Sequence, residues 1–329
     1  MLHSAGILAA TALIVLAGFW GGLALGYRIR AGRLVRTVCV SAWGAVGAIS
    51  VTALWSGRPM AGLAVFAAGL AAVLAWWRRL RPTNDADWAD DVARMARGTV
   101  DADRVTLHEV RNFEWRSDTD YTPRWETRTY DLGSLRSVDM IMSYWRGPAI
   151  AHMLISFGFA ASHVVFSVEI RRKRGQRYSE IGGFFKEFEL AIIASDELDV
   201  VRLRTHVRGE RVYLYPLRLT RMAMRQLFLS YVAAANGLLA QPRFYHTVTV
   251  NCTTLVYQMM QRIVGRLPLS YRLLFSGYMP EYVYAVGGLD RRHTLEELRE
   301  RGFISQRARQ SVRGENFSAD IRAGIPRAK

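Results

Sequence analysis

The first eighty residues alternate long apolar stretches with short basic segments. The stretches 6–27, 34–55 and 60–77 run for about 18 to 22 residues each and carry almost no charge, which is long enough for a helix to cross a hydrocarbon core of about 30 Å. Tryptophans at their ends, among them Trp55 and Trp77, are typical of a membrane–water interface. Because the first stretch lacks a basic leader and more apolar segments follow it, residues 1–80 are expected to form a three-helix transmembrane anchor instead of a cleaved signal peptide or buried core helices.

After residue 80 the apolar stretches become shorter. The polar segment 81–97 contains Pro82 and is expected to be a linker, 98–303 to be the folded domain, and 304–329 to be a loosely packed basic arm. Alternating apolar and polar positions, with Gly, Asp, Asn and Pro between them, predict strands. These strands are expected over 104–110, 125–132, 137–145, 150–157, 163–171, 187–194, 200–206 and 212–217.

Two helices are expected after the strands. Thr220 is a preferred N-cap residue, and the apolar spacing behind it predicts a helix that stops at Asn236-Gly237. A second helix is expected to begin at Asn251-Cys252 and to end at Val264, where Gly265 supplies the C-terminal stop. The domain is therefore predicted to be α+β, with a mainly antiparallel sheet and helices packed on it.

The charge balance is strongly basic. Lysine plus arginine number 44 against 28 acids, a net charge of +16, which suits nucleic acid or an anionic membrane surface. The anchor favours the membrane, so no nucleic acid partner is expected. The run 171–175 is expected to be a solvated turn, with a lipid-headgroup patch as the alternative. Arginines cluster in the first loop and after the third apolar stretch, and by the positive-inside rule this distribution places the folded domain in the cytoplasm.

The chain has two cysteines. Cys39 lies in an apolar stretch and Cys252 in the folded domain, so a disulfide between them is not expected, and neither has the C-x-x-C spacing of a metal site. No metal or cofactor is expected. Asn251 as N-cap would put Cys252 in the first helical turn, where the helix dipole favours a thiolate and free backbone N–H groups can receive an oxyanion. Thr253 belongs to the same turn. A buried structural cysteine is the alternative.

A cysteine nucleophile requires a base. His163 is the first candidate, because it opens a strand that can present an imidazole rigidly at a sheet end. His152 lies on an adjacent strand and could orient or replace His163, and His246 could approach Cys252 through a loop. Glu169 shares the strand of His163 but lies six residues away, about 20 Å in extended chain. The residues alone identify no third member of a triad.

The order of a histidine strand (Ser162-His163-Val164 to Glu169) and then Asn251-Cys252 opening a helix resembles the circularly permuted papain-like, NlpC-type superfamily, which includes lecithin:retinol acyltransferase. A closer resemblance covers nearly all of residues 82–325. Its motifs are similar to those of the bacterial membrane family associated with the N-terminal periplasmic domain of Lnb-type lipoprotein N-acyltransferases. They are Arg81-Pro-Thr-Asn84, Val110-Arg-Asn-Phe113, Thr127-Arg-Thr-Tyr-Asp131, Phe166-Ser-Val-Glu-Ile-Arg171 and Asn251-Cys-Thr-Thr254.

This resemblance implies a permuted papain-like domain and a Cys/His acyltransferase, with Cys252 as nucleophile and His163 as base. The acyl donor would be a phospholipid and the acceptor a lipoprotein N-terminal amine or another amine. It also implies a periplasmic domain on a multi-pass inner-membrane protein, against the arginine distribution, and we follow the resemblance. Two alternatives stay open: a membrane-tethered cysteine peptidase or amidase of the cell envelope, and a scaffold without activity in which Cys252 is buried and inert.

Overall fold

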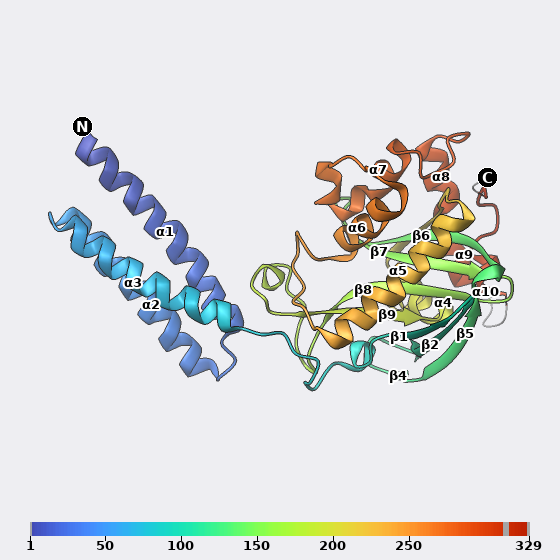
Figure 1. Cartoon of the computed structure of the whole chain (residues 1–329), viewed down its shortest axis with the longest axis horizontal. Helices are drawn as coiled ribbons and strands as arrows, with labels where there is room; N and C mark the ends of the chain where they lie inside the picture. Colours follow the sequence, from blue (N-terminus) through green and yellow to red (C-terminus); the bar gives the residue numbers. More distant parts are fainter. Residues whose placement is uncertain (1, 312–315, 328–329) are drawn as a thin grey trace. The chain divides into compact units, whose positions relative to one another are not determined.

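The computed structural model describes residues 2–311 and 316–327 (Figure 1). The chain divides into two compact units. One comprises residues 1–83 together with 179–187, and the other comprises 84–178 and 188–329. The second unit, called the domain below, holds the sheet and every candidate site residue.

The first unit contains three long apolar helices, α1 (Leu2–Arg28), α2 (Arg33–Trp55) and α3 (Pro59–Arg79), each long and apolar enough to span a membrane. Close approaches hold them together: Trp43 Nε1 donates a hydrogen bond to Gly18 O at 2.7 Å. The 179–187 segment packs in the same unit, where Phe185 stacks on Tyr27 with ring centroids 5.8 Å apart. The predicted three-helix anchor is confirmed.

The domain is built on an eight-stranded sheet with the order β1-β2-β9-β8-β7-β6-β10, in which β5 also pairs with β2. Every pairing is antiparallel except β2 with β9. The mainly antiparallel α+β fold is therefore confirmed. The strands are β1 (Arg97–Asp101), β2 (Arg104–Arg111), β5 (Trp125–Asp131), β6 (Leu135–Arg146), β7 (Ile150–Phe159), β8 (His163–Arg171), β9 (Glu189–Ser195) and β10 (Arg211–Pro216), with a separate ribbon of β3 (Glu114–Trp115) and β4 (Tyr121–Thr122).

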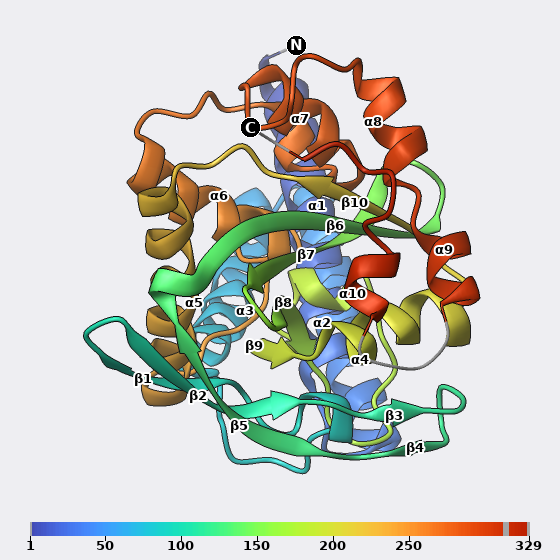
Figure 2. The same ribbon diagram turned by 90° about the vertical axis from the view of Figure 1, so that its right-hand side faces the viewer.

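Both faces of the central strands are covered, which explains their nearly continuous apolar sequences. Met153 and Ile155 of β7 face one core, while Leu154 between them faces the other. The larger core lies under α5 (Arg221–Ala240) and α6 (Cys252–Val264), and the smaller one under α4 (Glu197–Arg202), α9 (Ser305–Gln310) and α10 (Phe317–Asp320) (Figure 2). The remaining elements are α7 (Met279–Ala285), α8 (Leu295–Gly302), a π-helical turn at Leu203–Val207, and the short 3₁₀ turns at Asp90–Val92, Leu132–Ser134, Gly182–Phe184, Tyr271–Leu273 and Ser276–Tyr278.

Two element predictions were wrong. The predicted strand over 200–206 is α4 and the π-helical turn that follows it, because Asp196 caps a helix by accepting from Leu198 N at 2.8 Å. The helix that begins after Thr220 does not stop at Asn236-Gly237 but runs to Ala240. The Asn236 amide bonds both Gly98 N and Gly98 O of β1, so it joins helix to strand instead of ending the helix.

The expected linker is shorter than 81–97. Asn84 donates hydrogen bonds to the carbonyl oxygens of Leu238 and Leu239, at 3.0 and 2.9 Å. Trp88 is buried, with the Arg171 guanidinium 4.4 Å from its ring centroid. The domain therefore begins at about residue 84, because tertiary contacts already order this polar segment.

The 304–329 segment is not a loosely packed arm where the structure describes it. Ile304, Ala308, Phe317 and Ile321 are buried in the smaller core. Arg322 lies between two buried carboxylates and donates to Asp139 Oδ2 at 2.8 Å and to Glu197 Oε1 at 2.6 Å. The segment has a polar sequence because its few apolar residues are separated by arginines. One of these arginines, Arg322, neutralises carboxylates in the interior of the domain.

The basic run 171–175 is neither a freely solvated turn nor an unpaired lipid patch. Arg171 is a buried strand residue that donates to the carbonyl oxygens of Val92 and Ala93. Arg172 pairs with Asp91 at 2.9 Å, and Arg174 pairs with Asp87 and Asp90. The acidic segment before β1 thus neutralises this run.

Candidate active site

Helix α6 begins at Cys252, as predicted, and Asn251 is its N-cap. Asn251 Oδ1 accepts hydrogen bonds from Thr253 N and Thr254 N, both at 2.9 Å, and the Thr254 hydroxyl accepts from Asn251 N. This reciprocal capping box fixes the first turn of the helix. Because two first-turn N–H groups are used by the cap, they are not free for an oxyanion. In the part of the chain that the structure describes, the N–H of Cys252 itself has no hydrogen-bond acceptor.

The Cys252 thiol lies at the point where the β7–β8 ladder ends. That ladder runs from the Gly158–His163 pair to the Leu154–Ser167 pair, and α6 contacts both strands. The His152 side chain and the Met153 backbone N–H act on the sulfur, and both lower the pKa of the thiol. Only 8% of Cys252 is exposed. The nucleophile candidate is therefore buried, but against an imidazole and not among apolar side chains alone.

His152 is held from its other side by β8. Its Nε2 lies 2.7 Å from the Ser167 hydroxyl and 3.1 Å from Glu169 Oε1, and the same hydroxyl donates to Glu169 Oε1 at 2.6 Å. Since Nε2 faces Ser167 and Glu169, Nδ1 is the ring nitrogen left to exchange a proton with the thiol. We refer to Cys252, His152 and Glu169 as the triad.

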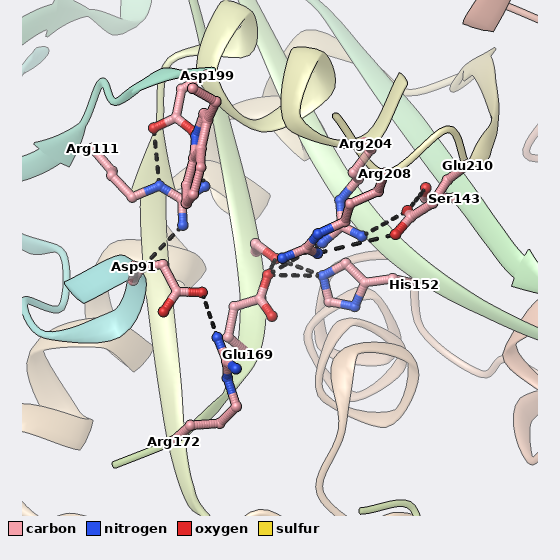
Figure 3. Close-up of polar contacts among 12 residues, drawn as sticks. Asp91, Arg111, Ser143, His152, Glu169, Arg172, Asp199, Arg204, Arg208 and Glu210 are labelled. Atoms are coloured by element: carbon pink, nitrogen blue, oxygen red, sulfur yellow. Dashed lines mark hydrogen bonds and ion pairs between the residues drawn. The ribbon is translucent and has the colours of Figure 1, made fainter. Parts of the chain in front are cut away.

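A second layer of charges supports Glu169 (Figure 3). Arg204 Nη2 lies 3.6 Å from Glu169 Oε1, and its Nη1 donates to Glu210 Oε2 at 3.2 Å. Glu210 also accepts from the Ser143 hydroxyl. No sequence pattern singles out Arg204, Glu210, Ser143 or Ser167, because only the fold brings these side chains together.

The backbone that carries Arg204 is itself anchored by a buried ion pair. Arg111 binds Asp199 through two parallel hydrogen bonds of 2.9 and 3.0 Å, and Asp199 also accepts from Phe113 N and Trp115 Nε1. Asp199 lies in α4, immediately before the π-helical turn that contains Arg204. Figure 3 shows Arg111 bound to Asp199 and Arg204 beside Glu169. The motif around Arg111 thus holds the helix that precedes Arg204.

The electrostatics favour a charged cysteine–histidine pair. Burial opposes ionisation of Cys252, but the hydrogen bond and charge of His152 and the N–H of Met153 hold the pKa of the thiol below its ordinary value. Burial likewise opposes the charged imidazole, but the Glu169 carboxylate and Cys252 raise the pKa of His152 to about 9. Although burial penalises its charge as well, His152 and Arg204 keep the pKa of Glu169 well below its usual range. The opposite shifts of the two pKa values both favour a thiolate–imidazolium pair.

His163 does not take part in this arrangement. It pairs with Gly158 at the far end of the β7–β8 ladder, and Gly158 is six residues from His152, about 20 Å along an extended strand. Burial chiefly lowers its pKa, and the charges acting on it are those of Glu197, Arg322 and Asp139. The expectation that His163 is the base beside Cys252 is corrected: the structure brings His152 to the thiol.

The other predicted residues are placed as follows. Glu169, too far from His163 to orient it, faces His152 instead. The Thr253 hydroxyl lies 4.0 Å from the Cys252 sulfur, within the contact range of sulfur. His246 Nδ1 accepts from Val248 N and Thr249 N, so it shapes the turn before α6 and does not face the thiol through this nitrogen.

Two tyrosines add phenols near the sulfur. Burial, and after it the negative charge of Cys252, raise the pKa of both Tyr231 and Tyr245. Both phenols therefore stay protonated. In the described residues, no group of three or more His, Cys, Asp or Glu side chains is arranged to hold a metal ion. The chemistry that this site can support is nucleophilic attack by a thiolate, followed by proton transfer through an imidazole.

Residues 121–277 match the family model described as the Lnb N-terminal periplasmic domain. The chain carries an Lnb N-terminal periplasmic domain. The matched residues include Cys252, His152 and Glu169. No curated protein and no solved structure matches the chain.

The Lnb domain also settles the side of the membrane. With three candidate spans and a domain of a periplasmic family, the chain is a multi-pass inner-membrane protein whose domain lies in the periplasm. The expectation of a cytoplasmic domain from the arginine count was wrong. An odd number of spans puts the residues before the first span and the Lnb domain on opposite sides, so the four arginines around the first loop lie on the periplasmic side.

Proposed function

We propose that this Lnb-domain protein is a cysteine acyltransferase of the inner membrane. In this proposal an acyl chain moves from a phospholipid to Cys252 as a thioester, and then to the N-terminal amine of a lipoprotein. The observation that carries it is the triad, in which a thiol at a capped helix start faces an imidazole that a carboxylate supports. Nucleophilic acyl transfer uses this arrangement of nucleophile, base and supporting carboxylate.

In the first half-reaction the Cys252 thiolate attacks the ester carbonyl carbon of the phospholipid. A carbon–sulfur bond forms as the ester carbon–oxygen bond breaks, and the His152 imidazolium gives its Nδ1 proton to the departing alkoxide. The products are a lysophospholipid and an acyl-enzyme. The N–H of Cys252 and the protonated phenol of Tyr245 are the donors available for the oxyanion.

In the second half-reaction the acceptor amine attacks the thioester carbonyl. His152, now neutral, takes the amine proton as the carbon–nitrogen bond forms and the carbon–sulfur bond breaks. The thiolate and the imidazolium are thereby restored. Glu169 stabilises the imidazolium before acylation and after it is restored, and fixes the plane of the ring through Ser167.

The anchor supports a lipid donor. Three spans keep the domain beside the bilayer, where phospholipid esters are concentrated, and a thiolate is a competent nucleophile toward an ester. The burial of Cys252, which a non-enzymatic scaffold would also show, here shields a thiolate from the oxidising periplasm. A scaffold gives no reason for a carboxylate-supported imidazole beside that thiol.

The decisive experiment tests whether Cys252 becomes acylated. Purified full-length protein is incubated with phospholipid carrying a labelled acyl chain, and intact mass and lysophospholipid release are measured. We expect one acyl group per chain in the wild type and normal acylation in the matched Cys39→Ala variant. In Cys252→Ala we expect no bound label and a rate of lysophospholipid release lower by about 10³-fold or more. Full labelling of Cys252→Ala would refute the proposal.

The same triad could serve a cysteine peptidase or amidase, and substrate choice separates the two. Muropeptides offered in parallel are expected to remain intact while lysophospholipid is released. Muropeptide cleavage that depends on Cys252, without lysophospholipid release, would replace acyl transfer by envelope hydrolysis.

A further inference from the structure

The segment after α6 exposes an unusual number of large apolar side chains. Within residues 264–275, Leu269 is 86% exposed and Tyr271 is 64% exposed, and Val264, Leu274 and Phe275 are exposed as well. Contiguous exposed apolar residues of this kind mark interaction surfaces in soluble parts of proteins. We refer to residues 264–275 as the 264–275 loop.

This loop is ordered although its side chains point outward. The hydroxyls of Tyr257 and Tyr282 donate to Leu267 O and Pro268 O, each at 2.9 Å. Leu273 is buried in the larger core, and Ser270 caps the 3₁₀ turn at Tyr271–Leu273. The exposed apolar side chains are therefore held in place by a fixed backbone.

The charge around the loop has one sign. Residues 252–280 contain Arg262, Arg266 and Arg272 and no aspartate or glutamate. Within the described residues these arginines pair with no carboxylate, and the Arg272 guanidinium lies 5.7 Å from the Tyr271 ring centroid. Apolar and aromatic side chains flanked by unpaired arginines are the composition of segments that lie in the headgroup region of anionic membranes.

The tether is short enough to bring such a surface to lipid. Helix α3 ends at Arg79, and Asn84 is already bonded into the domain, so at most about 18 Å of extended chain separates them. The 179–187 segment provides a second connection, since it packs in the membrane unit through Phe185 and through Lys186, whose Nζ donates to Trp77 O at 2.9 Å.

We propose that the 264–275 loop is a bilayer-contact surface, which inserts its apolar side chains among lipid headgroups while the three arginines bind anionic phosphates. Helix α6 begins at Cys252 and ends at Val264, so its length sets the nucleophile about 20 Å from this surface. The inference depends on the membrane anchor and not on acyl transfer, so either can fail without the other.

The test places a fluorophore in the loop. Leu269→Cys, in a full-length background with Cys39→Ser and Cys252→Ser, is labelled with an environment-sensitive dye and reconstituted in phosphatidylcholine nanodiscs containing phosphatidylglycerol. Val100→Cys is the matched control, because Val100 is an exposed apolar residue of β1. We expect blue-shifted emission at residue 269 and strong quenching by headgroup-proximal nitroxide lipids, with little of either at residue 100.

Further arms test each part of the proposal. Tyr271→Cys should reproduce the quenching and guards against a local effect of one substitution. Removing phosphatidylglycerol or adding salt should weaken the quenching, because both reduce attraction between arginines and lipid phosphates. Emission at residues 269 and 271 that is unquenched and equal to residue 100 would overturn the proposal, and quenching indifferent to lipid charge would overturn the role of the arginines.

Discussion

At the scale of single residues, proton flow at the site depends on how His152 is held. Its Nε2 is engaged by Ser167, and the Ser167 hydroxyl donates onward to Glu169. This chain fixes Nε2 as a donor, so the proton that moves during the reaction is the one on Nδ1. An imidazole elsewhere on the sheet cannot substitute, because the geometry is specific to β7 and β8.

The two histidines therefore have different predicted roles. His152→Ala should slow acylation by about 10²- to 10⁴-fold, since it removes the general acid and base, and should slow alkylation of Cys252 by iodoacetamide. His163→Gln, the matched control, should leave both rates within about threefold of the wild type. Stopped-flow alkylation with intact-mass readout measures this, and a larger defect in His163→Gln than in His152→Ala would reverse the assignment.

The pH dependence of alkylation reports the charged pair. Because the pKa of Cys252 is lowered and that of His152 is raised to about 9, the thiolate–imidazolium pair exists between these two values. Alkylation should therefore reach half of its maximal rate at a lower pH than that of an ordinary cysteine, as a pH series of iodoacetamide rates would measure.

In Glu169→Gln the carboxylate that raises the pKa of His152 is lost. The imidazolium deprotonates at lower pH, the pKa of Cys252 rises, and alkylation at pH 7 should slow. Glu300→Gln, at an exposed position, is the control. An unchanged pH profile in Glu169→Gln would mean that the carboxylate does not act on the pair.

The register of two predicted strands could have identified the base from the sequence. The strands over 150–157 and 163–171 were both predicted, and they form a hairpin in which Gly158 pairs with His163. Six steps outward from that pair bring His152 opposite Glu169, on the same face of the sheet. His163 was preferred because it opens a strand, but that position lies at the turn. Arg204 was out of reach, because its segment was taken for a strand, and Glu210 lies between two predicted strands, where no pattern indicates its partner.

At the scale of elements, α6 is the unit on which the nucleophile depends. Asn251→Ala should lower the free energy of unfolding by about 1–2 kcal/mol, because Thr253 N and Thr254 N lose their acceptor. Asn251→Ser, which keeps a capping oxygen, should retain most of that stability. Thermal unfolding of the full chain, followed by near-ultraviolet circular dichroism, measures both, and equal losses in the two variants would show that the cap is not the source of the effect.

Elements with a local signal were predicted well, and elements fixed by tertiary contacts were not. The apolar spans, the start and end of α6 and most central strands follow from periodicity and capping residues. Asp196 was a capping signal for α4, but the apolar residues Val200, Val201 and Leu203 gave the appearance of a strand. The packed C-terminal helices were missed because their few apolar residues are separated by arginines.

At the scale of the whole molecule, one arginine joins the C-terminal segment to the sheet. Arg322→Met should reduce the free energy of unfolding by about 3 kcal/mol, because it leaves Asp139 and Glu197 buried without a counterion. The control Arg225→Met removes a more exposed ion pair with Asp103 and should cost less than about 1 kcal/mol. Denaturant titration compares them, and similar losses would show that the buried carboxylates do not need Arg322.

The position of Arg322 along the chain has a consequence for biosynthesis. Asp139 and Glu197 precede it by 183 and 125 residues, so both acids are made and exported long before their counterion. Until that late segment arrives, the growing polypeptide holds two carboxyl groups that resist dehydration, and the nascent sheet cannot close over them. Completion of the periplasmic fold therefore waits until the segment around Arg322 has crossed the membrane.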